Sequence, residues 1–366
     1  MKTRRVESLA GFEALSPAWA TVVRESGQTS PFLSHEWFTC CWRGAGAGRR
    51  PEAILVEDTT GPVGLVPLTH WRGNLHRLPV RFVGMLNSPD TPYVDWLMVG
   101  RPEPVVDAVL TELMRRRDWD VFALAGLPAD SLTLKALETV LPGRFRTLRL
   151  PALRSPYVDV SGSWNAFWTG TSQRFKKTVR SIRNRLQKAG EIRVEEHRDL
   201  APGSPILDEV IDVSRRSWKA VENVAIANMP GMRDFFRELT ACASRNGWLR
   251  LWLLRLDGRV VATEYQLEAA GRVHALRADF DGTLPSDLSP GTHLSEEIIR
   301  RLFERPGIHE YDMGPGDNAY KQRWATGTHE HVRLLIFRPG AVGATLHTMA
   351  NRIVPGLRRL RPGSAR

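Results

Sequence analysis

The sequence predicts a mixed α/β fold made of two similar units, and three observations support this. The 366 residues suffice for one large or two medium domains, and 42% hydrophobic residues are ample for packed cores. Short apolar runs typical of strands alternate with longer amphipathic segments. The pattern of apolar run, acidic–glycine turn and apolar run at residues 54–68 recurs at residues 253–267, which suggests two copies of one unit.

In the first half, after an amphipathic entry, the pattern predicts alternating strands and helices. Strands are expected at residues 51–57, 62–71, 93–99, 119–125, 145–150 and 155–160, and helices at residues 104–117 and 132–141. We expect residues 1–150 to form a degenerate N-terminal unit, because the special residues described below are confined to the second half.

The second half opens with a long basic segment, residues 163–189, whose apolar residues recur at helical spacing. Further helices are expected at residues 206–220, 232–245 and 292–304, and strands at residues 191–196, 248–256, 259–268, 272–280, 308–313 and 332–338. Asp257-Gly258 is a strong signal for a hairpin turn. Residues 151–340 are expected to form the C-terminal unit, and residues 341–366 a basic tail.

The charge of +11 favours anionic partners such as nucleotides, nucleic acid or a phospholipid surface. Three cysteines without CxxC spacing fit a reduced cytoplasmic compartment. Acids near the N-terminus argue against a signal peptide, and no apolar run reaches the ~18 residues of a membrane span. The tail interleaves arginines with apolar residues. It indicates either a peripheral contact with the inner face of the membrane or a disordered end.

Residues 311–321 are the most informative part of the chain. They combine Asp312, Gly314, Gly316, Tyr320 and Lys321 in one strand-to-turn passage. Glycines allow close backbone approach, and a lysine supplies a compact charge for a phosphate or carboxylate. The alternative is a plain turn with an exposed lysine. We interpret the passage as part of a substrate site, with the tyrosine as a candidate general acid.

A second candidate site lies at Ser289, Gly291 and Thr292, just before an expected helix and after an expected strand. Free backbone N–H groups and the helix dipole make a helix start an anion site. The alternative is an ordinary N-cap.

Acidic residues on or near the central strands are candidate bases. Glu264 and Asp279 could accept a proton from an amine if burial raises their pKa. Solvent-facing positions or turn capping remain alternatives. In the basic segment Arg180 is one of seven cations without an intervening acid, which suits phosphate or tRNA, although a solvated face is the alternative. His329 and His331 without a third ligand do not predict a metal site.

The second half resembles the GNAT superfamily of N-acyltransferases. The resemblance rests on "RFKKTVRSIRNRLQKAG", Trp218, "LLRLDGRVVA", "RADFD" with Arg277, "SPG" and "DMGPGDNAYKQRW". Within the superfamily it is similar to the tandem branch related to Fem aminoacyltransferases and to acetyltransferase-like proteins with cell-envelope and exopolysaccharide functions. The first half resembles a degenerate copy of the same fold.

This resemblance implies mostly antiparallel sheets with one parallel, splayed pair of strands and helices on both faces. It implies an N-acetyltransferase-class enzyme that moves an acyl group from acyl-CoA, with acetyl-CoA as the expected donor, to an amine. The acceptor is expected to be a small or envelope precursor, possibly a sugar or a phosphorylated compound. Ser289, Gly291 and Thr292 then take the position of the pyrophosphate site. Asp312, Gly316, Lys321, Trp218, Arg277 and Arg180 take substrate contacts.

Two other functions stay open. The usual glycine signature of the pyrophosphate loop is absent, so the aminoacyl-tRNA donor of the Fem relatives is an alternative to coenzyme A. The second alternative is a non-catalytic adaptor at the cell envelope.

Overall fold

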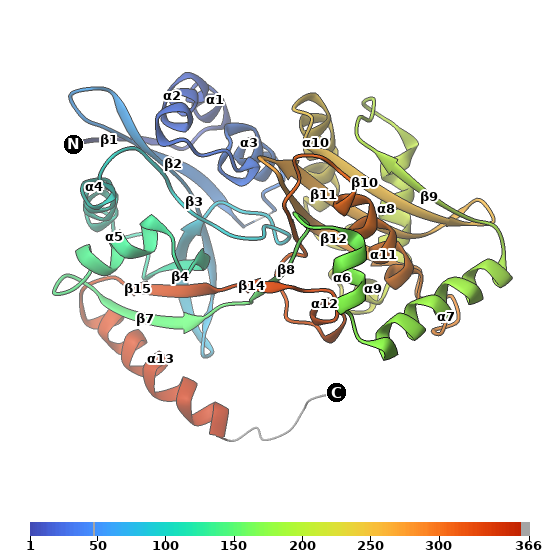
Figure 1. Cartoon of the computed structure of the whole chain (residues 1–366). Helices are drawn as coiled ribbons and strands as arrows, with labels where there is room; N and C mark the ends of the chain where they lie inside the picture. The colour runs from blue at the N-terminus through green and yellow to red at the C-terminus, as the bar shows by residue number, and fades with distance from the viewer. Residues whose placement is uncertain (47, 360–366) are drawn as a thin grey trace.

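A computed structural model describes residues 1–46 and 48–359 and contains two β-sheets, each covered by helices (Figure 1). This confirms the expected mixed α/β fold with mostly antiparallel sheets. The first sheet has the order β1-β2-β3-β4-β6-β15-β7, with β5 paired to β3. The second has the order β14-β8-β13-β12-β11-β10-β9.

The first sheet is built mainly from the first half of the chain. Its strands are β1 (Lys2–Val6), β2 (Arg50–Glu57), β3 (Pro62–Leu75), β4 (Leu78–Met85), β5 (Leu97–Met98), β6 (Val121–Pro128), β7 (Arg146–Pro151) and β15 (His331–Phe337). The helices beside it are α1 (Leu9–Glu13), α2 (Ser16–Ser26), α3 (His35–Arg43), α4 (Pro102–Met114), α5 (Leu132–Val140) and α13 (Ala341–Arg359), with a 3-10 turn at Pro31–Leu33.

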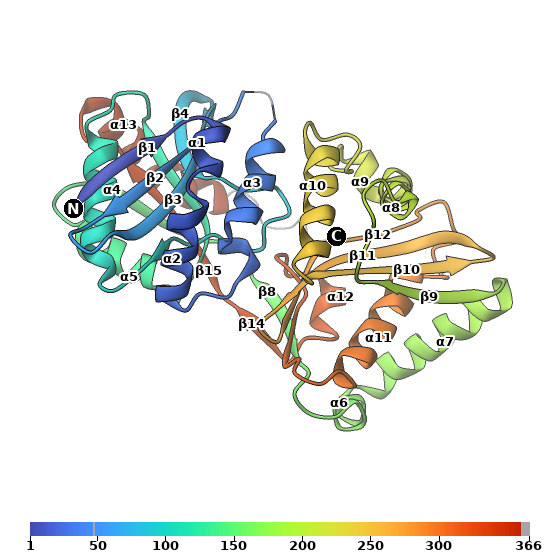
Figure 2. The ribbon, with the colours of Figure 1, turned by 90° about the horizontal axis from the view of Figure 1, so that it is seen from above.

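The second sheet and its helices come from residues 155–329. Its strands are β8 (Ser155–Asp159), β9 (Ile192–His197), β10 (Leu249–Leu256), β11 (Arg259–Ala269), β12 (Arg272–Phe280), β13 (Glu310–Asp312) and β14 (Gly327–His329). The helices are α6 (Trp164–Gly170), α7 (Gln173–Ala189), α8 (Pro205–Arg216), α9 (Trp218–Val221), α10 (Met232–Arg245), α11 (Pro290–Phe303) and α12 (Ala319–Gln322). Figure 2 shows α8, α9 and α10 on one face of this sheet and α6, α7, α11 and α12 on the other.

The two sheets repeat one pairing scheme, which explains the repeat in the sequence. In each, three antiparallel strands are followed by a helix and a strand parallel to the third: β2-β3-β4, α4 and β6 in the first, β10-β11-β12, α11 and β13 in the second. The expected hairpin at Asp257-Gly258 is confirmed, with both residues at positive φ.

The chain crosses between the sheets twice, and these crossings bound the space between the two units. The strand β7 lies in the first sheet and the next strand, β8, in the second. In the other direction, β14 lies in the second sheet while β15 pairs with β6 and β7 in the first. The expected limits of the two units stay a prediction. We note that residues 331–337, inside the range expected for the second unit, hydrogen bond within the first sheet.

The two units also share a hydrophobic core. Buried residues of α8 and α10 belong to the same cluster as the core of the first unit. At this junction the rings of Trp37 on α3 and Phe235 on α10 meet edge to face, 5.5 Å apart. A separate core lies between the second sheet and the helices α7 and α11. Because the shared core fixes the units against each other, side chains from both can build one site.

Three expected elements differ from the structure. The single helix expected at residues 163–189 is divided into α6 and α7, since Thr171 is extended and the Ser172 hydroxyl accepts a hydrogen bond from the N–H of Phe175 as a new N-cap. Likewise, Ser217 separates α8 from α9. The strand expected at residues 93–99 shrinks to β5. Of the tail expected at residues 341–366, residues 341–359 form α13 and residues 360–366 lie outside the described residues.

Candidate active site

The parallel strands β12 and β13 pair only briefly and then part. They hydrogen bond over residues 272–274 and 310–312, after which the chain leaves β13 through Gly314. Gly314 has φ 76°, and a Cβ here would lie 2.6 Å from the carbonyl oxygen of Ala275 on β12. Only glycine fits this close approach, so the turn is fixed where the strands diverge. This confirms a splayed parallel pair.

The strand β12 contains a bulge next to the divergence. Tyr265 of β11 pairs with Arg277 and Gln266 pairs with Ala275, so Leu276 has no partner on that neighbour. A bulge leaves the extra residue out of the ladder and bends the strand. The bulge therefore lies just beyond the residues at which β12 and β13 stop pairing.

A histidine–aspartate pair lies where the strands part. The Nδ1 atom of His274 on β12 is 3.2 Å from Oδ2 of Asp312 on β13. The other carboxylate oxygen accepts hydrogen bonds from the Ser155 hydroxyl, at 2.5 Å, and from the Gly314 N–H, at 2.8 Å. Burial alone would raise the pKa of Asp312, but these partners together hold that pKa well below its usual range. A fixed, ionised carboxylate thus orients the imidazole.

A cleft of about 650 Å³ separates the two units, and His274 and Asp312 line it. From the first unit the cleft is lined by residues that include Tyr93, Asp95, Trp96 and Ser131. The ring of Tyr93 lies 6.2 Å from that of His274. Because both units contribute walls, the first unit is part of this site even though it lacks the motifs of the second.

Two further histidines line the same cleft at the crossing between β14 and β15. The Nε2 atom of His329 is 3.0 Å from the carboxylate of Glu310, and its ring stacks on Tyr157 at 4.5 Å. The hydrogen bond to Glu310 raises the pKa of His329, whereas burial lowers the pKa of His331. The pKa values of these two histidines thus shift in opposite directions although both residues lie at the same crossing.

Glu264 lies on the opposite face of the sheet, toward α11. Its side chain is 3% exposed, and its carboxylate accepts hydrogen bonds from Gln266 at 2.7 Å and from the Tyr311 hydroxyl. Gln266 accepts in turn from the indole N–H of Trp252. Burial raises the pKa of Glu264 although these hydrogen bonds oppose the shift. The carboxylate is positioned within a closed network and does not line the cleft between the units.

Asp279 and Arg277, both candidate site residues, are committed to the protein itself. The Asp279 carboxylate contacts the ammonium of Lys219 at 3.0 Å and Nε of Arg277 at 2.8 Å. The remaining nitrogens of Arg277 donate to Asp90 of the first unit and to the carbonyl of Val224. Both carboxylate oxygens of Asp279 therefore contact cations of the protein, which weakens the case for Asp279 as a base. Arg277 acts here as a buried link between the units.

The start of α11 has the geometry of an anion site. Ser289 is in the left-handed region, with φ 43°, and no side chain caps the helix. Its hydroxyl donates instead to the carbonyl of Ser286. A Cβ on Gly291 would lie 3.3 Å from Phe280, so the helix start abuts the end of β12. The Thr292 N–H donates to the Ser289 carbonyl at 3.0 Å, which leaves the N–H of Gly291 and the helix dipole to stabilise an anion at this end of the helix.

Lys321 and Tyr320 on α12 differ in burial. The ammonium of Lys321 is 7% exposed and donates to the carbonyls of Gly314, at 2.8 Å, and of Pro315. Burial lowers its pKa to about 8. Gly316, with φ 111°, lies beside this ammonium. Tyr320 and Trp218 are 41% and 48% exposed. Lys321 therefore holds the turn where β13 ends, while Tyr320 and Trp218 are accessible.

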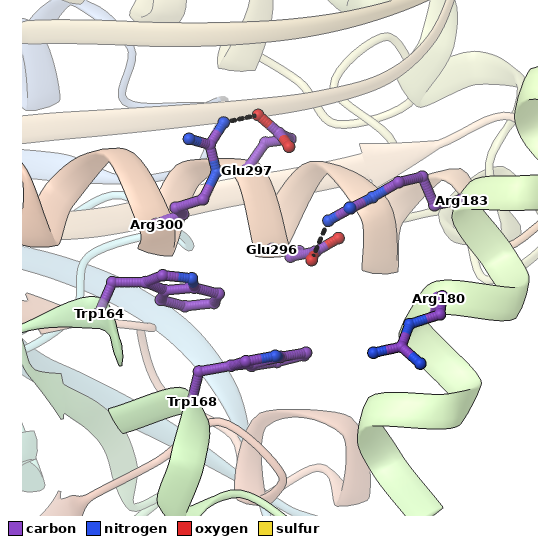
Figure 3. A pocket seen from close by; sticks show the side chains of 7 residues that line it. All are labelled: Trp164, Trp168, Arg180, Arg183, Glu296, Glu297 and Arg300. Carbon is purple, nitrogen blue, oxygen red and sulfur yellow. Dashed lines mark hydrogen bonds and ion pairs between the residues drawn. The ribbon is translucent and has the colours of Figure 1, made fainter. Parts of the chain in front are cut away.

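Arg180 lines a second cavity, of about 290 Å³, between α6, α7 and α11. Figure 3 shows the parallel indoles of Trp164 and Trp168 facing Arg180 across it. Arg183 pairs with Glu296 and Arg300 with Glu297. Among the described residues Arg180 makes no ion pair, so its guanidinium can contact an anion at this surface.

Sequence reasoning missed His274, Leu276 and the contribution of Tyr93. A histidine within the apolar strand "RVHALRADF" was a signal for the first. The bulge and the first-unit wall have no local signal, because both depend on pairing between distant segments.

No group of three or more potential metal-binding side chains occurs within residues 1–46 and 48–359. In the same ranges no helix is long and apolar enough to cross a membrane.

Comparisons with known proteins agree with the fold. Residues 173–322 match the family model described as an acetyltransferase (GNAT) domain. No curated protein matches the chain.

Solved structures match over nearly the whole chain at low identity. FemX matches with 11% identity and a TM-score of 0.58, covering 95% of this chain and 99% of FemX. The C-terminal domain of a putative lysylphosphatidylglycerol synthetase from Agrobacterium fabrum matches with 14% identity and a TM-score of 0.54, covering 95% of this chain and 97% of that one. A tandem GNAT protein from the clavulanic acid pathway matches with 12% identity and a TM-score of 0.52, covering 93% and 100%.

The matching range contains the strands that part, the bulge and the start of α11, which are the features of the candidate site. Residues 173–322 therefore match the acetyltransferase (GNAT) domain model, and the chain as a whole has the tandem fold that it shares with FemX and the tandem GNAT protein.

Proposed function

We propose that the protein transfers an acyl group from an acyl-CoA thioester, in the first place acetyl-CoA, to the amine of a small or cell-envelope precursor. One observation carries the proposal. The parting of β12 and β13 at the Leu276 bulge lies between a free helix start, at α11, and a cleft that contains His274. A donor held by its pyrophosphate at Ser289, Gly291 and Thr292 can then present its carbonyl at the bulge, facing an acceptor in the cleft.

The bulge supports stabilisation of the developing oxyanion. The backbone N–H at Leu276 is outside the ladder to β11 and can donate to the carbonyl oxygen as charge builds on it. Positioning both reactants at this point contributes at least as much as any single acid or base. Glu264 and Asp279 support the site from the network and the ion cluster in which they lie.

His274 is the candidate base that the geometry favours. Its Nδ1 faces the Asp312 carboxylate, which leaves Nε2 to accept a proton from the amine. The amine nitrogen bonds to the carbonyl carbon, the bond from that carbon to sulfur breaks, and a proton ends on the thiolate. Tyr320, with its accessible hydroxyl, is the proposed donor of that proton. Lys321 and Gly316 shape the turn beside it, and Trp218 is a candidate contact for the substrate.

The test is release of free thiol from acetyl-CoA in the presence of amines, together with the thermal midpoint of unfolding with and without the donor. We expect acetyl-CoA to raise the midpoint and amines to release thiol. Absence of both effects with short- and long-chain acyl-CoA would rule out the proposal.

A second candidate is transfer from aminoacyl-tRNA, and the surface of α7 favours it. Arg174, Lys177, Arg180 and Lys188 are exposed and make no ion pair among the described residues. Such a basic strip suits a nucleic acid backbone. This candidate predicts tRNA binding that weakens steeply with salt, and transfer of an amino acid that ribonuclease abolishes.

A peripheral location at the membrane surface is likewise a proposal, tested by sedimentation of the full chain with anionic vesicles.

A further inference from the structure

The cleft between the units carries a charge opposite to that of the whole chain. Although the protein has a formal charge of +11, the cleft is lined by five carboxylates and only one arginine. The carboxylates are those of Asp95, Asp130, Glu310, Asp312 and Glu330. The one arginine, Arg272, lies 3.6 Å from Glu310 and is therefore engaged.

Two of these carboxylates have no cationic partner. Glu310 contacts His329, Asp312 contacts His274, and Glu330 pairs with Arg154 at 2.7 Å. Asp95 and Asp130, both on the first-unit wall, make no ion pair among the described residues. Burial raises the pKa of Asp95, and the nearby charge of Asp130 adds to the shift. A cation brought to this wall would relieve that cost.

Two buried polar atoms of the cleft also lack partners. They are the indole N–H of Trp96, a residue that is 3% exposed, and Nδ1 of His331, which is 6% exposed. An indole N–H can only donate, and neither atom has exposed surface, so a ligand oxygen reaches them only when the cleft wall opens. Leaving such atoms unpaired is costly, and both residues line the cleft that also contains His274.

We propose that the acceptor is an unphosphorylated, hydroxylated primary amine, such as a free amino sugar, which binds this cleft as a cation. The inference rests on the proposed function and names its acceptor class. Asp95 and Asp130 attract the ammonium group, and hydroxyl oxygens of the ligand meet Trp96 and His331 once the cleft wall opens to expose them. The first unit, although degenerate in motif, then determines which acceptor is used.

The same observations disfavour a phosphorylated acceptor. A phosphate in the cleft would face carboxylates and would find no uncommitted arginine among the cleft residues. The helix α7, which carries the exposed cations, lies on the far side of the second unit from the first unit, as Figures 1 and 2 show. The donor pyrophosphate, at the start of α11, and the acceptor amine, in the carboxylate-lined cleft, are thus assigned to separate sites.

The proton balance is consistent with a cationic acceptor. The bound ammonium gives one proton to His274, from which it passes to solvent, and the neutral amine attacks the thioester carbonyl. The second nitrogen proton is offset by protonation of the departing thiolate. An ammonium ion and a thioester therefore yield an amide, a thiol and one proton.

The experiment compares matched amines with and without phosphate: glucosamine against glucosamine 6-phosphate, and ethanolamine against phosphoethanolamine. With the full chain and acetyl-CoA, we expect kcat/KM to be roughly tenfold or more higher for the unphosphorylated member. Equal or greater kcat/KM for the phosphorylated members would overturn the inference and leave the proposed function standing.

If no acyl transfer is detected, direct measurement of amine binding still tests the inference. Calorimetric titration of the same amines should then detect binding of an unphosphorylated member alone, and binding of neither or of the phosphorylated member would overturn it. The absence of thiol release and of acyl-CoA binding would instead count against the proposed function.

Variants of the first-unit wall, with a control pair outside the cleft, distinguish the role of Asp95 and Asp130 from a general effect of lost negative charge. D130N, at an exposed position, and D95N/D130N should raise KM for the amine with little change in kcat. Both variants should also reduce the ratio of kcat/KM between the unphosphorylated amine and its phosphorylated counterpart. The control E7Q/D58N removes two charges near the outer strands β1 and β2 and should leave both quantities unchanged. An unchanged KM in D95N/D130N would contradict the assignment of the wall.

Discussion

His274 and Asp312 lie 38 residues apart in sequence, yet their side chains meet at 3.2 Å where two parallel strands part. The pair faces the cleft between the units, while Tyr311, next to Asp312, points to the other face and hydrogen bonds Glu264. Alternation along β13 therefore directs the Asp312 carboxylate toward the cleft and the Tyr311 hydroxyl toward the opposite face of the sheet. This arrangement separates the acceptor side of the proposed reaction from the donor side.

Replacing His274 should impair chemistry more than binding. H274Q is expected to lower kcat by roughly 10²–10⁴-fold with a small change in KM for the donor, because it removes the proposed proton acceptor. The measurement is steady-state thiol release, with circular dichroism to verify folding.

H347Q is the matched control, since His347 contacts the carbonyl of Thr147 outside the cleft. If H274Q retains the wild-type kcat, another base serves the reaction.

Thr292 provides a test in which stability and donor binding move in opposite directions. T292E adds a negative charge to the first turn of α11, which should stabilise the protein by about 0.3–1 kcal/mol through the helix dipole. The same charge should weaken acyl-CoA binding roughly tenfold or more by occupying the anion site. Urea unfolding and calorimetric titration give the two quantities.

The neutral variant T292Q should change neither strongly. Loss of stability together with loss of binding in T292E would mean that the helix start is merely disrupted.

The buried Lys321 should make stability depend on pH. Its pKa is lowered from 10.5 to about 8 in the folded protein, so the unfolded chain binds more protons between these values. The free energy of unfolding should therefore rise with pH from about 8 to 10.5, by about 3.5 kcal/mol at most, because each pKa unit corresponds to about 1.4 kcal/mol.

Urea titrations across this range, compared with K321M, isolate the contribution. K321M should lack the rise, and parallel pH profiles for the two proteins would show that Lys321 titrates normally.

The contact between Arg277 and Asp90 should link the two units energetically. R277M leaves the carboxylates of Asp90 and Asp279 without this buried cation and should cost about 3–5 kcal/mol in unfolding free energy. Urea unfolding measures the loss, and R277M/D90N should lose less than the sum of the single variants.

As a control, R144A removes the exposed pair with Asp107 and should cost about 1 kcal/mol or less. Equal costs for R277M and R144A would contradict a structural role for Arg277.

The hairpin turns illustrate how far the sequence reaches. Asp257-Gly258 predicts its hairpin correctly, because this dipeptide readily adopts positive φ. The hairpin between β3 and β4 was not predicted at all. Its turn uses His76 and Arg77, which also have positive φ but carry no turn signal in sequence. The strand β4, which is the partner of the parallel strand β6, was missed for this reason.

Part of the candidate site was likewise predictable from local sequence patterns, and part was not. The glycine-rich passage at residues 311–321, the start of α11 and the basic residues of α7 were recognisable as local patterns. Sequence alone also determined the repeated α/β unit, because strand and helix periods are properties of short segments.

Only the tertiary structure decided which charges are free. It commits Arg277 and Asp279 to an internal ion cluster, and within residues 1–46 and 48–359 it leaves Asp95 and Asp130 without an ion pair on the first-unit wall of the cleft. It also brings His274 to Asp312. These are contacts between segments far apart in the chain, and their charge, burial and pairing exist only once both sheets are packed on one core.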